Sequence, residues 1–282
     1  GQGAFTREAL WRFQVTTFLA VPVVVLVLLG PPSPEKVFLG FILGQLLLLA
    51  TKIGRGFISR PKLAFPSWAV WKTCLPFIMI NAATMVYFKS DIILLKHFQP
   101  DLNIVGYYGA AFQFLEGVIL LATPIVHLHF RHLRLSWLDR KTFFRRLAGG
   151  MALAVLMAVL IIAVAAMYAP EIMVLIFGQA YRPAADLLPL LLLALLFLLP
   201  NFILTQGIIA QNGERYYAFA AVGCAVFNVG LNLLLIPAYA AKGAAFSTVA
   251  TEGLLMLLAG IWLARRYLRG GAPQGLSGKG EE

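Results

Sequence analysis

Charged residues are scarce in this sequence. Only 12% of its 282 residues are Asp, Glu, Lys or Arg, 60% are hydrophobic, and the mean hydropathy is +0.83. A soluble domain carries about 25% charged residues, so a fold of this composition cannot face water on all sides. The composition therefore excludes an ordinary soluble protein and predicts a polytopic membrane protein whose outer surface faces lipid.

Cysteines and catalytic motifs are also sparse. Cys74 and Cys224 each lie within an apolar run, which fits small core residues better than a disulfide framework or a CxxC metal site. The sequence shows no HExxH motif, no P-loop and no Ser-His-Asp set. We therefore expect a protein that is not an enzyme and that has no resident cofactor.

Three histidines gather in the segment HLHFRH, at His127, His129 and His132. On a helix these spacings do not bring all three to one face, and no cysteine or carboxylate lies beside them. A metal site would need such a convergence of ligands. We favour a basic cluster at the membrane interface, and we expect no metal site.

Long apolar segments are abundant, and short polar breaks separate them. A helix that crosses a bilayer needs about 20 mainly apolar residues. Segments of this kind occur at residues 8–29, 37–53, 69–98, 104–130, 147–168, 184–210, 216–236 and 243–264. We therefore predict an all-α fold of about eight transmembrane helices. The GFILG stretch at Gly40 to Gly44 is a GxxxG motif, which lets two helices approach closely.

The basic residues indicate an orientation. If the N-terminus is cytoplasmic and the helices alternate, all but five of the 23 Lys and Arg residues fall on the cytoplasmic side; the five are Lys36, Lys89, Lys96, Arg182 and Lys242. The positive-inside rule then favours cytoplasmic N- and C-termini. The basic residues behind the net charge of +11 lie mostly along this predicted cytoplasmic face. Membrane lipids with anionic head groups are therefore the expected partners, and nucleic acid is not.

Several polar side chains interrupt the apolar runs at similar depths. The stretch YFKSDIILLK, residues 87–96, contains Lys89 and Asp91, and a central charge costs at least ~2.5–3.5 kcal/mol on insertion scales. Counting about 1.5 Å per residue from each predicted outer helix end gives a depth for each polar side chain. These depths all lie between the outer third of the membrane and its midplane, so the side chains form one layer. The layer comprises Lys89, Asp91, Gln113, Glu116, Asn228, Asn232 and Glu252.

Lys89 and Glu116 are predicted to pair, because they lie at similar depths on consecutive antiparallel helices. Asp91 points about 200° away from Lys89 around a regular helix, so the two cannot face one partner. Asn81 shares the Lys89 face. Two interpretations stay open: the pair only neutralises two charges and joins two helices, or it lines a hydrated cavity that receives an anionic substrate while a carboxylate binds a proton or cation.

Three stretches carry a resemblance to a known family. They are LPFIMINAATMVYFKSDIILLKHFQPDLNIVGYYGAAFQFLEGVILL, LIFGQAYRPAADLLPLLL and NGERYYAFAAVGCAVFNVGLNLLLIPAYAAKGAAFSTVATEG. In this order they resemble the second lobe of polysaccharide-biosynthesis flippases, the Wzx-like branch of the multidrug/oligosaccharidyl-lipid/polysaccharide exporter superfamily. The resemblance covers roughly residues 70–265.

This resemblance implies a two-lobed, all-helical fold around a cationic cavity. The family moves undecaprenyl-pyrophosphate-linked oligosaccharides across the bacterial cytoplasmic membrane by alternating access, coupled to an ion gradient. We accordingly expect substrate contacts at Lys89, Gln113, Asn81 and Asn228. We expect coupling to H⁺ or Na⁺ at Glu116, Asp91 and Glu252.

The number of helices departs from this family, whose members have more than eight. Residues 67–268 are interpreted as a six-helix second lobe, and residues 1–66 as the last two helices of a first lobe with a basic cytoplasmic linker. Residues 269–282 are expected to form a disordered cytoplasmic tail. We expect the chain to be N-terminally truncated or to pair with a missing lobe, a partner chain or polysaccharide-assembly proteins.

Three other functions stay open. A drug or metabolite exporter of the same superfamily would share the fold and differ in substrate, and the basic residues favour an anionic lipid-linked glycan over it. A membrane-embedded glycan polymerase or ligase generally presents a long outer loop with catalytic Arg or His, whereas the predicted outer connection 169–183 holds one Arg and no His. A scaffold that transports nothing is the third.

Overall fold

The computed structural model describes residues 2–29, 33–50, 67–136 and 139–268, apart from the side chains of 2–13, 16, 34, 123–132 and 134–135. The regular structure in these residues is entirely helical, which confirms the all-α prediction. The elements are α1 (Gln2–Leu28), α2 (Pro34–Ala50), α4 (Trp68–Phe98), α5 (Leu102–Leu135), α6 (Arg140–Phe177), the 3₁₀ helix η1 (Gln179–Asp186), α7 (Leu188–Leu192), α8 (Leu195–Ala210) and α9 (Glu214–Leu268).

Five helical stretches in the described part are long and apolar enough to cross a membrane: Trp68–Phe98, Leu102–Ala122, Arg140–Phe177, Leu188–Ala210 and Glu214–Leu268. Large apolar side chains are exposed on them; Leu121 and Leu175, for example, are 78% and 86% exposed. Exposing such apolar surfaces to water is unfavourable in free energy, whereas exposing them to lipid is not. These features indicate a membrane protein with several transmembrane helices. The count of eight spans stays a prediction.

The chain divides into two compact units, Gly1–Ser67 and Trp68–Glu282. In the first, α1 packs against α2 through the GxxxG motif. A Cβ added to Gly40 would lie 2.6 Å from the Cα of Val23, and one added to Gly44 would overlap the carbonyl oxygen of Phe18. The close approach expected from the motif is therefore present. With 17 residues, α2 lies at the short end of the range for a span.

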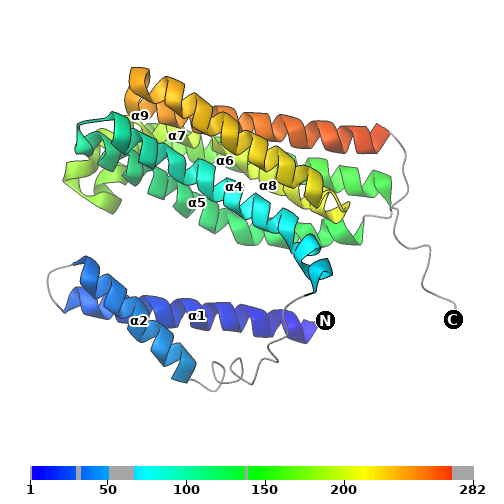
Figure 1. The fold of residues 1–282 in the computed structure, drawn as a ribbon, viewed down its shortest axis with the longest axis horizontal. Coiled ribbons are helices and arrows are strands. Elements are labelled where there is room, and N and C mark those ends of the chain that lie inside the picture. Colours follow the sequence, from blue (N-terminus) through cyan, green and yellow to red (C-terminus); the bar gives the residue numbers. More distant parts are fainter. Residues whose placement is uncertain (1, 30–32, 51–66, 137–138, 269–282) are drawn as a thin grey trace. The chain divides into compact units, whose positions relative to one another are not determined.

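The longest helix, α9, folds back on itself. A straight helix of 55 residues would extend about 80 Å, far more than the thickness of a bilayer. Ala240 interrupts it with a φ of 48°, and the Tyr216 hydroxyl donates to the carbonyl of Leu258 across the fold at 2.8 Å. The two limbs run side by side in Figure 1. They correspond to the separate spans predicted at 216–236 and 243–264.

Two other predicted spans differ from the helices. The span predicted at 147–168 lies within the longer α6, which continues past a kink at Tyr168 (φ −125°, ψ 23°) and contains Pro170. The span predicted at 184–210 is divided among η1, α7 and α8. The predicted linker and tail fall largely on residues 51–66 and 269–282, outside the described part, and the assignment of lobes stays a prediction.

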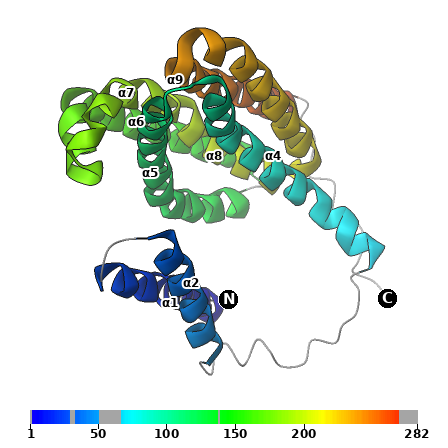
Figure 2. The same ribbon diagram turned by 60° about the vertical axis from the view of Figure 1, so that its left-hand side comes forward.

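The second unit positions the polar residues between five helical segments, namely α4, α5, α8 and the two limbs of α9. α8 is mainly apolar, with no pronounced polar face, and contacts α5, α6 and α9, as expected of a central helix. α4 lies along α9 in both views (Figures 1 and 2). Ala83 and Tyr87 of α4 pack there against Ala221 and Ala225 of the first α9 limb. Small side chains bring the backbones close, so polar groups on neighbouring helices can reach one another.

Candidate functional site

Lys89 and Glu116 form an ion pair on the surface of the second unit. Lys89 Nζ on α4 lies 2.7 Å from Glu116 Oε1 on α5 and 5.6 Å from the centroid of the Phe112 ring. The predicted pair is therefore present. Its side chains are 50% and 41% exposed, although both helices have the length and composition of membrane spans. Exposed charges at this depth require water or polar groups on their open side, as a substrate-accessible site would provide.

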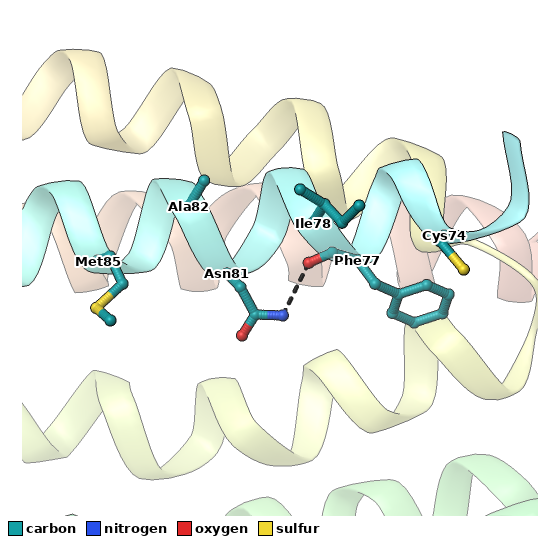
Figure 3. A pocket seen from close by; sticks show the side chains of 6 residues that line it. All are labelled: Cys74, Phe77, Ile78, Asn81, Ala82 and Met85. Carbon is teal, nitrogen blue, oxygen red and sulfur yellow. Dashed lines mark hydrogen bonds between the residues drawn. The ribbon is translucent and has the colours of Figure 1, made fainter. Parts of the chain in front are cut away.

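Asn81 lies about two helical turns from Lys89, in a shallow pocket on α4. The pocket has a volume of about 620 Å³ and is lined by Cys74, Phe77, Ile78, Asn81, Ala82 and Met85 (Figure 3). Asn81 Nδ2 donates to the carbonyl of Phe77 at 2.9 Å, which leaves the amide oxygen directed away from the helix (Figure 3). The side chain is accessible, and its assignment as a substrate contact stays a prediction.

Gln113 is exposed on α5, one turn before Glu116. Residues three apart on a helix lie on the same side, so the Gln113 amide is close to the ion pair along α5. Its accessibility is what a substrate contact requires. That role also stays a prediction.

Asp91 points away from Lys89 and is completely buried. Its Oδ2 accepts hydrogen bonds from the Tyr108 hydroxyl on α5 at 2.9 Å and from Thr248 Oγ1 on the second α9 limb at 2.7 Å. Its Oδ1 accepts a short hydrogen bond from Asn232 Nδ2 on the first α9 limb. One carboxylate of α4 thus joins three other helical segments.

Asn228 extends this network by one turn. Its Oδ1 accepts from Asn232 Nδ2 at 2.9 Å and from the Ser90 hydroxyl at 3.1 Å, and its Nδ2 donates to Thr251 Oγ1 at 3.1 Å. The two asparagines share a face, as their spacing predicts. The structure places Asn228 inside the network with Asp91 and not at the surface.

Glu252 forms a second buried carboxylate site. Its Oε1 accepts from the Tyr87 hydroxyl on α4 at 3.0 Å, and its Oε2 accepts from Asn201 Nδ2 on α8 at 2.7 Å. Asn201 Nδ2 also donates to the backbone carbonyl of Glu252 at 2.9 Å. Because a carbonyl only accepts, this bond fixes the orientation of the Asn201 amide. The site therefore holds its carboxylate with two neutral donors.

Each buried carboxylate lies beside an amide with an unused oxygen. Asn232 Oδ1 and Asn201 Oδ1 are both buried and have no hydrogen-bond partner in the described structure. Neither Asp91 nor Glu252 has a Lys or Arg partner among the described residues. A buried carboxylate is costly in its charged form unless a cation or a proton joins it. Each carboxylate with its neighbouring amide oxygen is therefore suited chemically to binding a proton or a single cation.

A larger metal site does not occur in the described part of the chain, where no three His, Cys, Asp or Glu side chains gather to hold an ion. The side chains of the HLHFRH cluster, His127, His129 and His132, lie outside that part. The two interpretations of the cluster therefore stay open.

The sequence pointed to the acidic residues but not to most of their partners. The sequence did not single out Tyr108, Tyr87 and Asn201. Tyrosine and asparagine occur often in apolar helices, and no neighbouring residue in the sequence distinguishes these three. Thr248 had a usable signal, since it lies four residues before Glu252 and so on nearly the same face of the limb.

Comparisons with known proteins assign no family. The chain matches no protein-family model, and no curated protein matches it significantly. The resemblance to polysaccharide flippases therefore depends on the three quoted stretches alone, and a function for this chain has to be argued from the geometry of its site.

Proposed function

We propose that the chain forms part of a transporter that flips an undecaprenyl-pyrophosphate-linked oligosaccharide across the bacterial cytoplasmic membrane, for polysaccharide biosynthesis. The observation that carries this proposal is the ion pair of Lys89 and Glu116, two half-exposed charges on helices that otherwise expose mainly apolar side chains. Such a pair is costly against lipid and useful in a hydrated cavity that receives an anion. The placement of basic residues supports cytoplasmic termini.

Lys89 is the group that attracts the pyrophosphate. Its ammonium has three donors, and one of them is directed at Glu116. A phosphate that approaches Lys89 is repelled by the Glu116 carboxylate, so anion binding favours displacement of Glu116 from Lys89. Substrate binding and the Lys89–Glu116 contact are thereby linked. Asn81 and Gln113, both accessible, are suited to sugar hydroxyls.

Asp91 and Glu252 are the sites at which an ion gradient acts. Each carboxylate joins α4 to other helices through neutral hydrogen-bond donors. A proton or Na⁺ bound at either carboxylate changes how strongly it accepts these bonds, and so changes how α4 is held. Because α4 also carries Lys89, ion binding in the interior and substrate binding at the surface act on the same helix.

The test is a flipping assay with the native gene product in liposomes. A fluorescent oligosaccharide on a polyprenyl pyrophosphate is incorporated in both leaflets, and a membrane-impermeant quencher reports movement between them. We expect flipping by the wild type and by Lys89→Arg, and loss of flipping in Lys89→Ala. The matched control is Lys242→Ala, an exposed lysine that forms no hydrogen bond or ion pair with described residues. Flipping that persists in Lys89→Ala would contradict the proposal.

A drug or metabolite exporter is distinguished in the same liposomes. Transport of a cationic dye in place of the lipid-linked glycan would assign the chain to that alternative. Equal movement of the same glycan on a polyprenol without phosphate would show that Lys89 does not recognise the anionic group, and would remove the basis of the proposal.

A further inference from the structure

Aromatic side chains bring three helix ends together at one end of the second unit. The Tyr267 ring near the end of α9 lies 4.6 Å from the Phe144 ring near the start of α6, centroid to centroid. Trp262 on the same limb stacks on Tyr216 near the start of α9, with centroids 5.7 Å apart. The start of α6 and both ends of α9 lie together at the right of Figure 1. The three ends therefore form one continuous surface.

This surface, which we call the basic end, carries an excess of positive charge. Its basic residues include Arg140, Lys141, Arg145, Arg215, Arg265 and Arg266, and none of these six forms an ion pair with a described carboxylate. The acidic residues on the same three helix ends are Asp139 and Glu214. Asp139 caps α6, and hydrogen bonds from Thr142 lower its pKa, so it stays charged and offsets one of the cations. The net charge is still strongly positive.

Two of the arginines rest on aromatic rings. The guanidinium carbon of Arg140 lies 4.3 Å from the Tyr267 centroid, and that of Arg266 lies 6.0 Å from the Trp262 centroid. A ring face holds a guanidinium without neutralising it and leaves the N–H groups at its edge free to donate. The positions of these arginines are thus fixed before any anion binds.

Trp262 is itself held in place. A Cβ added to Gly213, in the turn before α9, would lie 2.6 Å from the Trp262 ring, so the indole packs directly on the glycine backbone. Tyr216 covers it on another side. Tryptophan and tyrosine are also the residues that concentrate at the level of lipid head groups.

We propose that the basic end binds the head group of an anionic phospholipid, with Arg140 and Arg266 contacting its phosphate. This inference is independent of the transport function. A lipid fits better than a soluble anion, because the arginines lie at the ends of helices with the length and composition of membrane spans, and Leu268 and Ile261 expose apolar surface at the same end of α9. The acyl chains would lie along that surface, and basic pockets between spans at the cytoplasmic face bind anionic head groups in this way.

The experiment is native mass spectrometry of the full chain, purified in a neutral detergent and titrated with dioleoylphosphatidylglycerol or with zwitterionic dioleoylphosphatidylcholine. We expect the wild type to bind the anionic lipid more tightly. Arg140→Gln with Arg266→Gln should weaken that binding by roughly ten- to thirtyfold, because each basic residue near an anionic surface contributes a factor of about five. The matched control, Lys96→Gln with Lys242→Gln, removes the same charge elsewhere on the unit and should leave binding unchanged.

The paired Arg140→Lys and Arg266→Lys variant keeps the charge and should retain most of the binding, which separates loss of charge from loss of folding. Equal binding of both lipids, or an equal loss in the control variant, would overturn the proposal. Binding of inorganic phosphate as tight as that of the lipid would assign the basic end to a soluble anion and would also overturn it.

Discussion

Lys89 and Asp91 are two residues apart on α4, yet one is half exposed and the other is completely buried. Lys89 pairs with Glu116 at the surface, whereas Asp91 accepts hydrogen bonds from α5 and from both limbs of α9. One short segment therefore presents a cation to the outside and a carboxylate to the interior. A rotation or tilt of α4 would change the surroundings of Lys89 and of Asp91 at once. Ion-coupled transport requires a movement of this kind, which links an ion site to a substrate site.

The Lys89–Glu116 pair should matter for transport and little for folding. Exposed ion pairs contribute about 0.2–1 kcal/mol, so Lys89→Ala should lower the thermal unfolding temperature only slightly. Flipping should fall to the background rate, because the cation that attracts the anionic head group is gone. Thermal unfolding in detergent and the flipping assay, performed on the same preparation, test the two parts together.

Glu116→Gln provides the control for that prediction. It removes the carboxylate that competes with phosphate for Lys89, so the anionic substrate should bind at least as tightly as it binds to the wild type. A Glu116→Gln variant that binds the substrate more weakly than the wild type would contradict this competition between the two charges.

Asp91 should matter for folding as well. Asp91→Ala leaves the Tyr108 hydroxyl without its acceptor and removes one of the two acceptors of Asn232, and a buried donor without a partner costs about 1–3 kcal/mol. Asp91→Asn keeps one acceptor oxygen and nearly the same volume. We therefore expect the asparagine variant to unfold at a temperature between those of the wild type and the alanine variant.

Ion dependence separates the two roles of Asp91. If the carboxylate binds H⁺ or Na⁺, Asp91→Asn should abolish the effect of an ion gradient on flipping even where the protein remains folded. An Asp91→Asn variant that responds normally to both gradients would assign the residue to structure alone.

Much of the fold follows from the sequence, and the reason is the membrane. Because backbone in lipid must satisfy its own hydrogen bonds, every long apolar run has to be a helix, and polar breaks mark its ends. The fold-back of α9 was predicted from the break between residues 236 and 243. The division of 184–210 among η1, α7 and α8 was not, since Leu-rich runs carry no signal for a change from 3₁₀ to α geometry.

The charged residues of the site were predictable from the sequence, again because the protein lies in a membrane. A charge in an apolar run is conspicuous, so Lys89, Asp91, Glu116 and Glu252 were found. Similar depth on consecutive antiparallel helices was enough to pair Lys89 with Glu116. Tyr87 and Asn201 were missed because tyrosine and asparagine are tolerated in helices for many reasons. Which polar side chains meet depends on how helices rotate against one another, and that is set by packing and not by periodicity.

Tyr87 and Glu252 should show an energetic coupling. Tyr87→Phe removes one of the two side-chain donors to the carboxylate and should destabilise the protein by about 0.5–1.5 kcal/mol. In Glu252→Gln the loss from Tyr87→Phe should be smaller, since the hydroxyl no longer interacts with a carboxylate. A double-mutant cycle in thermal unfolding measures the difference. Additive effects of the two changes would mean that the hydrogen bond contributes nothing to stability.

The turn within α9 should depend on Gly243. A Cβ added there would lie 2.5 Å from the carbonyl oxygen of Leu235 and 2.7 Å from its carbon. These are backbone atoms at the point where the limbs meet, so they cannot move aside as a flexible side chain would. Gly243→Ala should therefore destabilise the second unit by about 1–3 kcal/mol, as overpacking does.

Gly230 is the matched control, because it lies on the first limb of the same helix and an added Cβ would meet nothing within 4 Å. Gly230→Ala should leave stability unchanged or raise it by up to about 1 kcal/mol, since alanine is the better helix former. Thermal unfolding of both variants in one detergent gives the comparison. If Gly243→Ala unfolds at the same temperature as Gly230→Ala, the limbs do not approach as closely as the structure has them. The second limb presents Thr248, Thr251 and Glu252 from a position that this turn determines, so their hydrogen bonds to α4 and to the first limb depend on the same close approach.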